Sequence, residues 1–229
     1  MTSTRPPTPA TELAVSIDAG PVRLEAILGE VPDPVGIVVF AHGSGSGRKS
    51  PRNHYVARQL QRAGMATLLL DLLTPEEDEI YRMRFDIALL EPRLAAACDW
   101  VRARQGYASL PIGLFGASTG AAVALRVAAA RPGQIAAVVS RGGRPDLAGV
   151  PALQQVRTPT LLIVGGNDAQ VIALNEAALE LMSCDARIDI VPGASHLFEE
   201  NGTLETAAAL AVTWFARHFG RPRDAAFTS

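Results

Sequence analysis

The chain has 229 residues, of which 48% are hydrophobic and 19% are charged, and its formal net charge is −2. This length and composition predict one globular domain with enough apolar residues to bury a core. A net charge of −2 gives no general electrostatic attraction to nucleic acid or to an anionic membrane surface. We therefore expect neither a nucleic acid nor a membrane as a partner.

The two ends of the chain carry no pattern typical of a folded element. Residues 1–11 are rich in proline and threonine and lack the apolar stretch of a secretory signal. We therefore expect a flexible N-terminus, a single domain over residues 12–220 and a C-terminal tail over residues 221–229. Because no apolar run reaches the length of a membrane-spanning helix, we expect a soluble, cytoplasmic protein.

The first half of the chain predicts a hairpin followed by alternating strands and helices. Two short runs at 12–17 and 22–28, separated by a turn that contains Gly20 and Pro21, are typical of an antiparallel β-hairpin. Asn53 is a candidate cap for the first helix, which ends near Ala63. The other predicted elements are a strand at 35–41, a strand at 65–70, an irregular acidic segment at 71–83 and a helix at 85–104.

The second half continues the alternation. The predicted elements are strands at 110–115, 135–140, 160–164 and 188–191, and helices at 121–130, 171–182 and 202–219. Continuously apolar strands between helices indicate a mostly parallel sheet with helices on both faces, which is an α/β fold. Only residues 141–159 connect the predicted strands at 135–140 and 160–164. They form at most a short helix at 147–156, so we expect no large lid domain.

The strongest motif is Gly116-Ala117-Ser118-Thr119-Gly120, between a predicted strand and a predicted helix. Gly-x-Ser-x-Gly in this context is a nucleophile elbow, a strained turn that exposes the serine hydroxyl. Because glycine has no Cβ atom, Gly116 and Gly120 let neighbouring backbone pass close to the turn. We therefore predict that Ser118 is a nucleophile; the alternative is a glycine-rich turn with an idle serine.

A serine hydroxyl needs a base to remove its proton, and the base needs a partner that sets its tautomer. Asp168 and His196 each follow a later predicted strand. The carboxyl ends of parallel strands meet at one edge of a sheet, so the two side chains should lie near Ser118. We predict His196 as the base and Asp168 as the orienting acid.

Other residues compete for these two roles. Asp146 follows the strand after the elbow and is the rival acid; otherwise it is a turn or cap residue. His42 precedes Gly43 at a strand end, and we expect it to shape the following loop. His54 begins a helix, and His218 lies near a helix C-terminus, where its interaction with the helix dipole is favourable.

Residues 42–50, His-Gly-Ser-Gly-Ser-Gly-Arg-Lys-Ser, nearly match the phosphate-binding pattern Gly-x4-Gly-Lys-Ser/Thr. Arg48 stands where the second glycine is required, and a phosphate loop would leave the later Ser, Asp and His unexplained. We predict instead an oxyanion loop. In it the backbone N–H of Ser44 points at the substrate oxygen beside the N–H of Thr119.

Two segments are candidates for the walls of a substrate pocket. One is the acidic segment, whose apolar members are Leu72, Leu73, Tyr81 and Met83; a solvated connection is the alternative. Phe198, two residues after His196, is a candidate for another wall. No broad apolar surface for a lipid interface is evident, which favours small soluble substrates.

The loop that begins at His42, the elbow, Asp168 and the run Gly193-Ala194-Ser195-His196 resemble the dienelactone-hydrolase-like branch of the α/β-hydrolases. The resemblance covers roughly residues 22–219. It implies the α/β-hydrolase fold, without a cofactor or a metal. Dienelactone hydrolase proper uses a cysteine nucleophile where this chain has Ser118, which favours a general serine esterase.

The predicted function is therefore hydrolysis of small soluble carboxylic esters or lactones through an acyl-enzyme intermediate. A non-catalytic α/β-hydrolase-fold binding protein is the alternative, and a nucleotide-binding enzyme with a phosphate loop is a distant third. Cys98 and Cys184 lie far apart and away from other metal-ligating residues, so we predict no disulfide and no zinc site. The predicted partner is the ester or lactone itself, and a homo-oligomer is left open.

Overall fold

The computed structural model describes residues 10–220. Of the predicted flexible start at 1–11, residues 1–9 lie outside the described range, as does the predicted tail at 221–229, and residue 11 begins the first strand. The described strands form one eight-stranded sheet in the order β1-β2-β4-β3-β5-β6-β7-β8. Their bounds are β1 Thr11–Ala19, β2 Val22–Glu30, β3 Ile37–Ala41, β4 Ala66–Leu70, β5 Ile112–Ala117, β6 Ile135–Arg141, β7 Thr160–Gly165 and β8 Ala186–Val191.

The first two strands form the predicted antiparallel hairpin, and β2 also pairs antiparallel with β4. The other neighbouring strands pair in parallel. Every residue of β3, β4, β5 and β7 is buried, as expected for strands with helices on both sides. The predicted α/β architecture is confirmed, and it brings the carboxyl ends of β3, β5, β6, β7 and β8 to one edge of the sheet.

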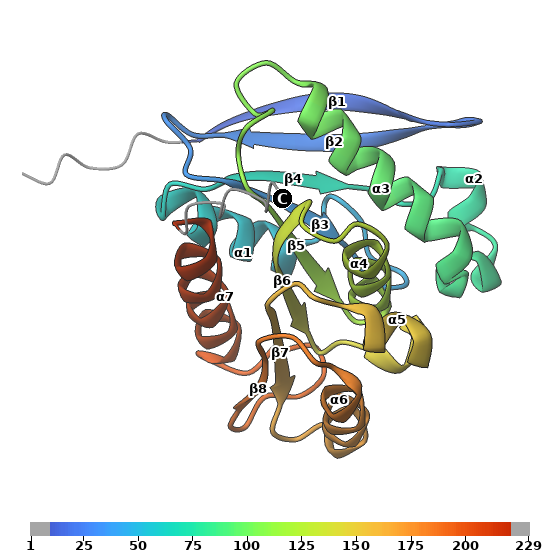
Figure 1. Cartoon of the computed structure of the whole chain (residues 1–229), viewed down its shortest axis with the longest axis vertical. Coiled ribbons are helices and arrows are strands. Elements are labelled where there is room, and N and C mark those ends of the chain that lie inside the picture. Colours follow the sequence, from blue (N-terminus) through green and yellow to red (C-terminus); the bar gives the residue numbers. More distant parts are fainter. Residues whose placement is uncertain (1–9, 221–229) are drawn as a thin grey trace, which may run out of the picture.

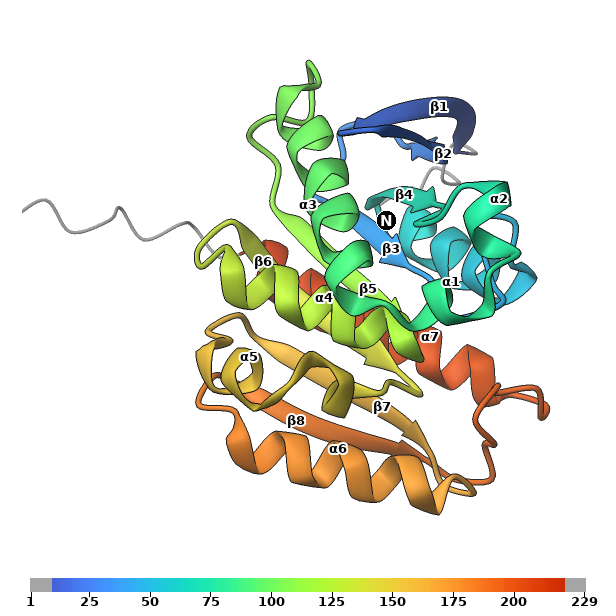
Figure 2. The same cartoon turned by 90° about the vertical axis from the view of Figure 1, so that its right-hand side faces the viewer.

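Helices cover both faces of the sheet (Figures 1 and 2). On one face lie α1 Pro51–Arg62 and α7 Thr203–Phe219. On the other lie α3 Ile87–Ala103, α4 Thr119–Ala130, the short α5 Val150–Gln155 and α6 Ala169–Leu181. Each face buries its own apolar cluster, one containing Leu68 and Leu114, the other Phe40 and Phe115. Burial on both faces fixes the strands, and with them the loops at their carboxyl ends.

The cap of α1 differs from the prediction. The helix begins at Pro51, and Ser50 is its cap; the Ser50 hydroxyl accepts a hydrogen bond of 3.5 Å from the Asn53 N–H. Proline suits the first helical position because that position has no intrahelical use for an N–H. Asn53 is therefore a buried residue of the first turn and not the cap.

The segment at 71–83 is also more ordered than predicted. It contains α2 Pro75–Asp78 and the 3₁₀-helix η1 Tyr81–Phe85. Thr74 and Glu77 cap α2 reciprocally, through a hydrogen bond of 3.3 Å from the Glu77 N–H to the Thr74 hydroxyl and one of 2.9 Å from the Thr74 N–H to the Glu77 carboxylate. Arg93 of α3 holds the same carboxylate at 2.6 and 2.7 Å. We call residues 72–86 the cap segment.

Candidate active site

Three predicted side chains meet at the carboxyl edge of the sheet. Ser118 follows β5, Asp168 follows β7, and His196 follows β8. His196 Nδ1 lies 2.7 Å from Asp168 Oδ2, and His196 Nε2 lies 3.3 Å from Ser118 Oγ. Because a carboxylate oxygen can only accept, Nδ1 carries the proton and the lone pair of Nε2 faces the serine hydroxyl. This is the geometry in which a histidine can remove the serine proton.

The backbone at Ser118 is strained. Its φ is 50° and its ψ is −120°, a conformation that residues with a side chain rarely adopt. A Cβ added at Gly116 would lie 2.5 Å from Ala121 Cα, and one at Gly120 would lie 2.1 Å from the Ala41 carbonyl oxygen. Gly116 is therefore needed for the close packing of β5 on the start of α4, and Gly120 for the packing of α4 on the end of β3, as the motif predicted.

Asp146 and Asp168, the two candidates for the orienting acid, bind different partners. Both Asp146 oxygens accept from Arg144, at 2.9 and 2.7 Å, in the 3₁₀-helix η2 Pro145–Ala148. Asp168 faces His196 with its side chain only 16% exposed, so little water competes for its oxygens. The geometry therefore favours Asp168 over Asp146 as the partner of His196.

The loop after β3 packs directly on the elbow. A Cβ at Gly43 would lie 2.9 Å from Ser118 Cβ and 3.0 Å from the Ala117 carbonyl oxygen. The following residue, Ser44, is exposed. Thr119 occupies the first turn of α4, where backbone N–H groups have no intrahelical acceptor. Both predicted oxyanion donors thus belong to segments that border Ser118.

The same loop does not form a phosphate cradle. The Arg48 N–H donates to Asp71 Oδ1 at 2.5 Å, and the Arg48 guanidinium pairs with Asp71 Oδ2. A carboxylate thus occupies the donors that a phosphate would need, and its charge would repel one. A Cβ at Gly47 would also lie 2.6 Å from Asp71 Oδ1, so the carboxylate fills the space beside the loop.

The other histidines have structural contacts. His42 Nδ1 lies 2.9 Å from the Gly43 carbonyl oxygen, and His42 Nε2 accepts from the Leu72 N–H at 2.9 Å. His54 Nδ1 lies 3.7 Å from Glu12, and His218 packs on Trp214 with a centroid distance of 4.5 Å. Only His196 contacts a candidate nucleophile among the described histidines.

The five predicted pocket residues are placed differently from one another. Leu72 and Phe198 are 0% and 1% exposed and belong to the two apolar clusters. They support the loops that carry the site and offer almost no surface to a ligand. Leu73 is also nearly buried and Met83 half-buried, whereas Tyr81 is 71% exposed and packs only partly on Phe85, with a centroid distance of 5.1 Å.

Sequence reasoning missed Arg141, the last residue of β6. Its carbonyl oxygen accepts from the Ser118 N–H at 3.2 Å, and its guanidinium lies 5.9 Å from the ring centroids of both Phe115 and Phe198. Nε and Nη1 are buried without a hydrogen-bond partner in the part of the chain that the structure describes. Burial, with a smaller contribution from the charge of Arg52, lowers the pKa of Arg141 to about 10. A lone arginine at a strand end has no sequence signal that predicts this position.

No group of three or more His, Cys, Asp or Glu side chains within residues 10–220 has the arrangement of a metal site. No helix in the same range combines the length and apolarity required to cross a membrane.

The chain matches one family model, and it is similar both to solved structures and to curated sequences. A family model described as an alpha/beta hydrolase domain matches residues 34–218. A solved dienelactone hydrolase from Anabaena variabilis is 54% identical, with a TM-score of 0.89 and coverage of 92% of this chain and 99% of that chain. Est1E from Butyrivibrio proteoclasticus shares the fold, with 15% identity, a TM-score of 0.77 and coverage of 91% and 99%.

A curated relative from Mycobacterium tuberculosis carries a different description. It is named "Putative phosphoribosyl transferase" and is 52% identical over 214 residues, which cover 93% of this chain but 48% of that protein. The chain therefore spans about half the length of the curated relatives it matches.

Proposed function

Because the chain belongs to the α/β-hydrolase family, we propose that it is a serine hydrolase that cleaves carboxylic esters or lactones through an acyl-enzyme intermediate. The proposal rests mainly on the hydrogen-bonded series Asp168–His196–Ser118, in which the two contacts are 2.7 and 3.3 Å. The dienelactone hydrolase that is 54% identical over nearly its whole length supports the same class of reaction.

The first half of the reaction acylates the serine. His196 Nε2 takes the proton of Ser118 Oγ while the oxygen attacks the ester carbonyl carbon. The carbonyl oxygen becomes an oxyanion, which the N–H groups of Ser44 and Thr119 stabilise. When the tetrahedral intermediate collapses, the bond to the alcohol oxygen breaks, and His196 returns the proton to the departing alcohol.

The second half uses water in place of the serine. Water gives a proton to His196 and attacks the acyl carbon. Ser118 then leaves with that proton, and the carboxylic acid is released. In both halves the negative charge of Asp168 stabilises the transient imidazolium and keeps the imidazole in the required tautomer.

The short connections above the site favour small substrates. Only residues 142–159 join β6 to β7, and they form η2 and α5 without an inserted lid. The His196 side chain is 38% exposed, so the base is open to solvent. We propose short-acyl esters or lactones in solution as the substrate class.

A binding protein that has lost catalysis is the alternative from another class. Against it stand the left-handed backbone of Ser118 and an aligned acid and base. Such strain costs about 1–3 kcal/mol and persists mainly where function requires it.

The description as a phosphoribosyl transferase belongs to a protein of which this chain spans about half. In this chain Asp71 occupies the donors of the loop after β3 that a phosphate group would need, which is against a transferase function. Magnesium-dependent nucleotide binding would instead support the third candidate, a nucleotide-binding enzyme with a phosphate loop.

A fluorophosphonate probe tests the proposal, because it reacts covalently with an activated serine. Wild-type protein should be labelled and should hydrolyse p-nitrophenyl acetate, whereas Ser118→Ala should lose both properties and remain folded. Ser109→Ala, at an exposed serine before β5, is the matched control and should behave as wild type. Labelling and turnover that survive in Ser118→Ala would reject this site.

A further inference from the structure

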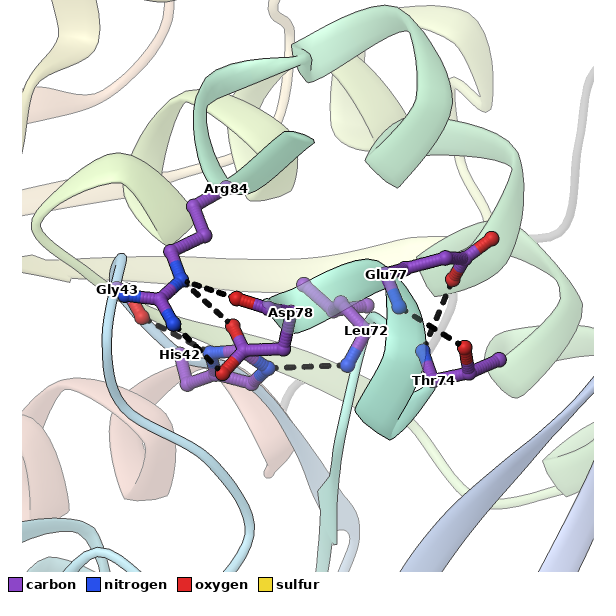
Figure 3. Close-up of polar contacts among 7 residues, drawn as sticks. All are labelled: His42, Gly43, Leu72, Thr74, Glu77, Asp78 and Arg84. Atoms are coloured by element: carbon purple, nitrogen blue, oxygen red, sulfur yellow. Dashed lines mark hydrogen bonds and ion pairs between the residues drawn. The ribbon is translucent and has the colours of Figure 1, made fainter. Parts of the chain in front are cut away.

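We infer that His42 is a positioning residue for the proposed hydrolysis: it orients the peptide between Gly43 and Ser44 so that the Ser44 N–H faces the reacting oxygen. The inference rests on the proposed function and adds a residue that acts through the oxyanion loop. Its evidence is the contact set of His42, drawn in Figure 3.

The hydrogen bonds of His42 fix its tautomer. Nε2 accepts from the Leu72 N–H at 2.9 Å, so this nitrogen has no proton. The proton therefore resides on Nδ1, which donates to the Gly43 carbonyl oxygen at 2.9 Å. Both ring nitrogens are occupied by backbone groups, and the ring connects the loop after β3 to the start of the cap segment (Figure 3).

The peptide unit between Gly43 and Ser44 links His42 to the nucleophile. The Gly43 carbonyl and the Ser44 N–H belong to one peptide, and no described peptide bond is cis. In a trans peptide these two groups point in opposite directions. A carbonyl held toward His42 therefore directs the Ser44 N–H away from His42. Since a Cβ added at Gly43 would lie 2.9 Å from Ser118 Cβ, the peptide lies directly beside the nucleophile.

Burial and a neighbouring ion pair keep the His42 ring in place. His42 is buried, which lowers its pKa, although the hydrogen bond to Gly43 and the charges of Asp71 and Asp78 oppose this effect. Asp78 is itself held by Arg84, whose Nε donates to the Asp78 carbonyl oxygen at 2.8 Å and whose Nη2 donates to its carboxylate at 3.1 Å. Figure 3 shows this pair beside the imidazole. The neutral ring thus has one fixed orientation.

The two ends of the ring can be separated by substitution. In His42→Asn the amide nitrogen replaces Nδ1 and still donates to Gly43, but the acceptor for Leu72 is lost. In His42→Gln the longer side chain keeps an oxygen near the Nε2 position for Leu72, but the side-chain donor to Gly43 is lost, and the Gly43 carbonyl keeps only the hydrogen bond of 3.2 Å from the Ser46 N–H. The inference predicts that kcat depends on the Gly43 end alone.

The expected results follow from the role of an oxyanion donor, which acts in the transition state and not in substrate binding. Removal of one such donor costs about 10²–10³-fold in kcat, so a misdirected Ser44 N–H in His42→Gln should lower kcat by up to about 10²-fold with KM little changed. His42→Asn should keep most of kcat while its melting temperature falls. The affinity for phenyl trifluoromethyl ketone, whose serine adduct carries an oxyanion, should fall in His42→Gln in parallel with kcat/KM.

Several outcomes decide the matter. An active wild type with unchanged kcat and ketone affinity in His42→Gln would overturn the inference alone. A wild type that is neither labelled by fluorophosphonate nor active on esters would overturn the proposed function and the inference together. If His42→Gln does not fold, ¹⁵N-resolved NMR of the wild-type histidines decides: the inference requires an Nδ1-protonated His42 that does not titrate around pH 6.5, where an exposed histidine does. A titrating ring, or a proton on Nε2, would overturn it.

Discussion

Replacement of Asp168 by asparagine should remove most of the activity while leaving the fold intact. Asp168 is the only acid within hydrogen-bond distance of His196 in the described residues, and it accepts from Nδ1 at 2.7 Å. An asparagine at this position can donate to Nδ1, which would move the ring proton to Nε2. The Nε2 atom, 3.3 Å from Ser118 Oγ, could then no longer accept the serine proton.

The size of the loss follows from the lost tautomer and the lost charge. The same substitution in a serine protease lowers kcat by about 10⁴-fold, which corresponds to about 5.4 kcal/mol of transition-state stabilisation. In this chain His196 is 38% exposed, so water partly solvates the imidazolium. We therefore expect a loss on the order of 10³–10⁴-fold in kcat.

The assay is kcat for p-nitrophenyl acetate, with Asp146→Asn as the matched control. Asp146 lies near the same edge of the sheet but pairs with Arg144, so its substitution should change kcat little. Circular dichroism and thermal melting show whether each variant folds. A folded Asp168→Asn that retains kcat within tenfold of wild type, or a larger loss in Asp146→Asn, would refute the assignment of the acid.

Four further predictions concern metal independence, substrate size, packing and pH. Activity should survive EDTA, because the proposed reaction uses side chains and backbone N–H groups of the chain and no metal; a loss that added metal restores would require another mechanism. Esters with short acyl chains should have higher kcat/KM than long ones, with no jump at the micelle threshold, and an increase toward long chains would point to an interfacial site. Gly120→Ala should cost about 1–3 kcal/mol or more, since its Cβ would lie 2.1 Å from the Ala41 carbonyl oxygen, whereas Gly220→Ala, with a nearest contact of 3.6 Å, should be nearly neutral in thermal melts. Hydrogen bonds from Arg93 lower the pKa of Glu77, so their stabilisation is present above the ordinary value of 4.5 and is lost as the pH falls through the folded-state pKa. Urea unfolding should therefore show Glu77→Gln less stable than wild type at neutral pH, with a gap that closes in acid; a constant gap would contradict this.

Much of the fold could be predicted from local pattern. Continuous apolar runs between helical segments indicated a parallel sheet, and these strands are buried on both faces because helices flank each of them. The elbow was recognisable because its glycines answer a local steric demand that the structure shows at Gly116 and Gly120. The order of Ser118, Asp168 and His196 sufficed to place all three at strand ends.

The remaining details depend on partners that are distant along the chain. The sequence of the cap segment predicted an irregular structure, whereas the segment forms α2 and η1. The prediction failed because the helix with the capping box is short and because Arg93, which binds Glu77, lies on another helix. Asp146 could be set apart from Asp168 as the partner of His196 only once the structure showed that Asp146 pairs with Arg144. The role that we infer for His42 depends on its hydrogen bond with Leu72, thirty positions later. Local propensity and periodicity constrain the backbone within a few residues, whereas a hydrogen-bond partner is chosen by distance in space. That distance exists only after the sheet has assembled and brought the strand ends together.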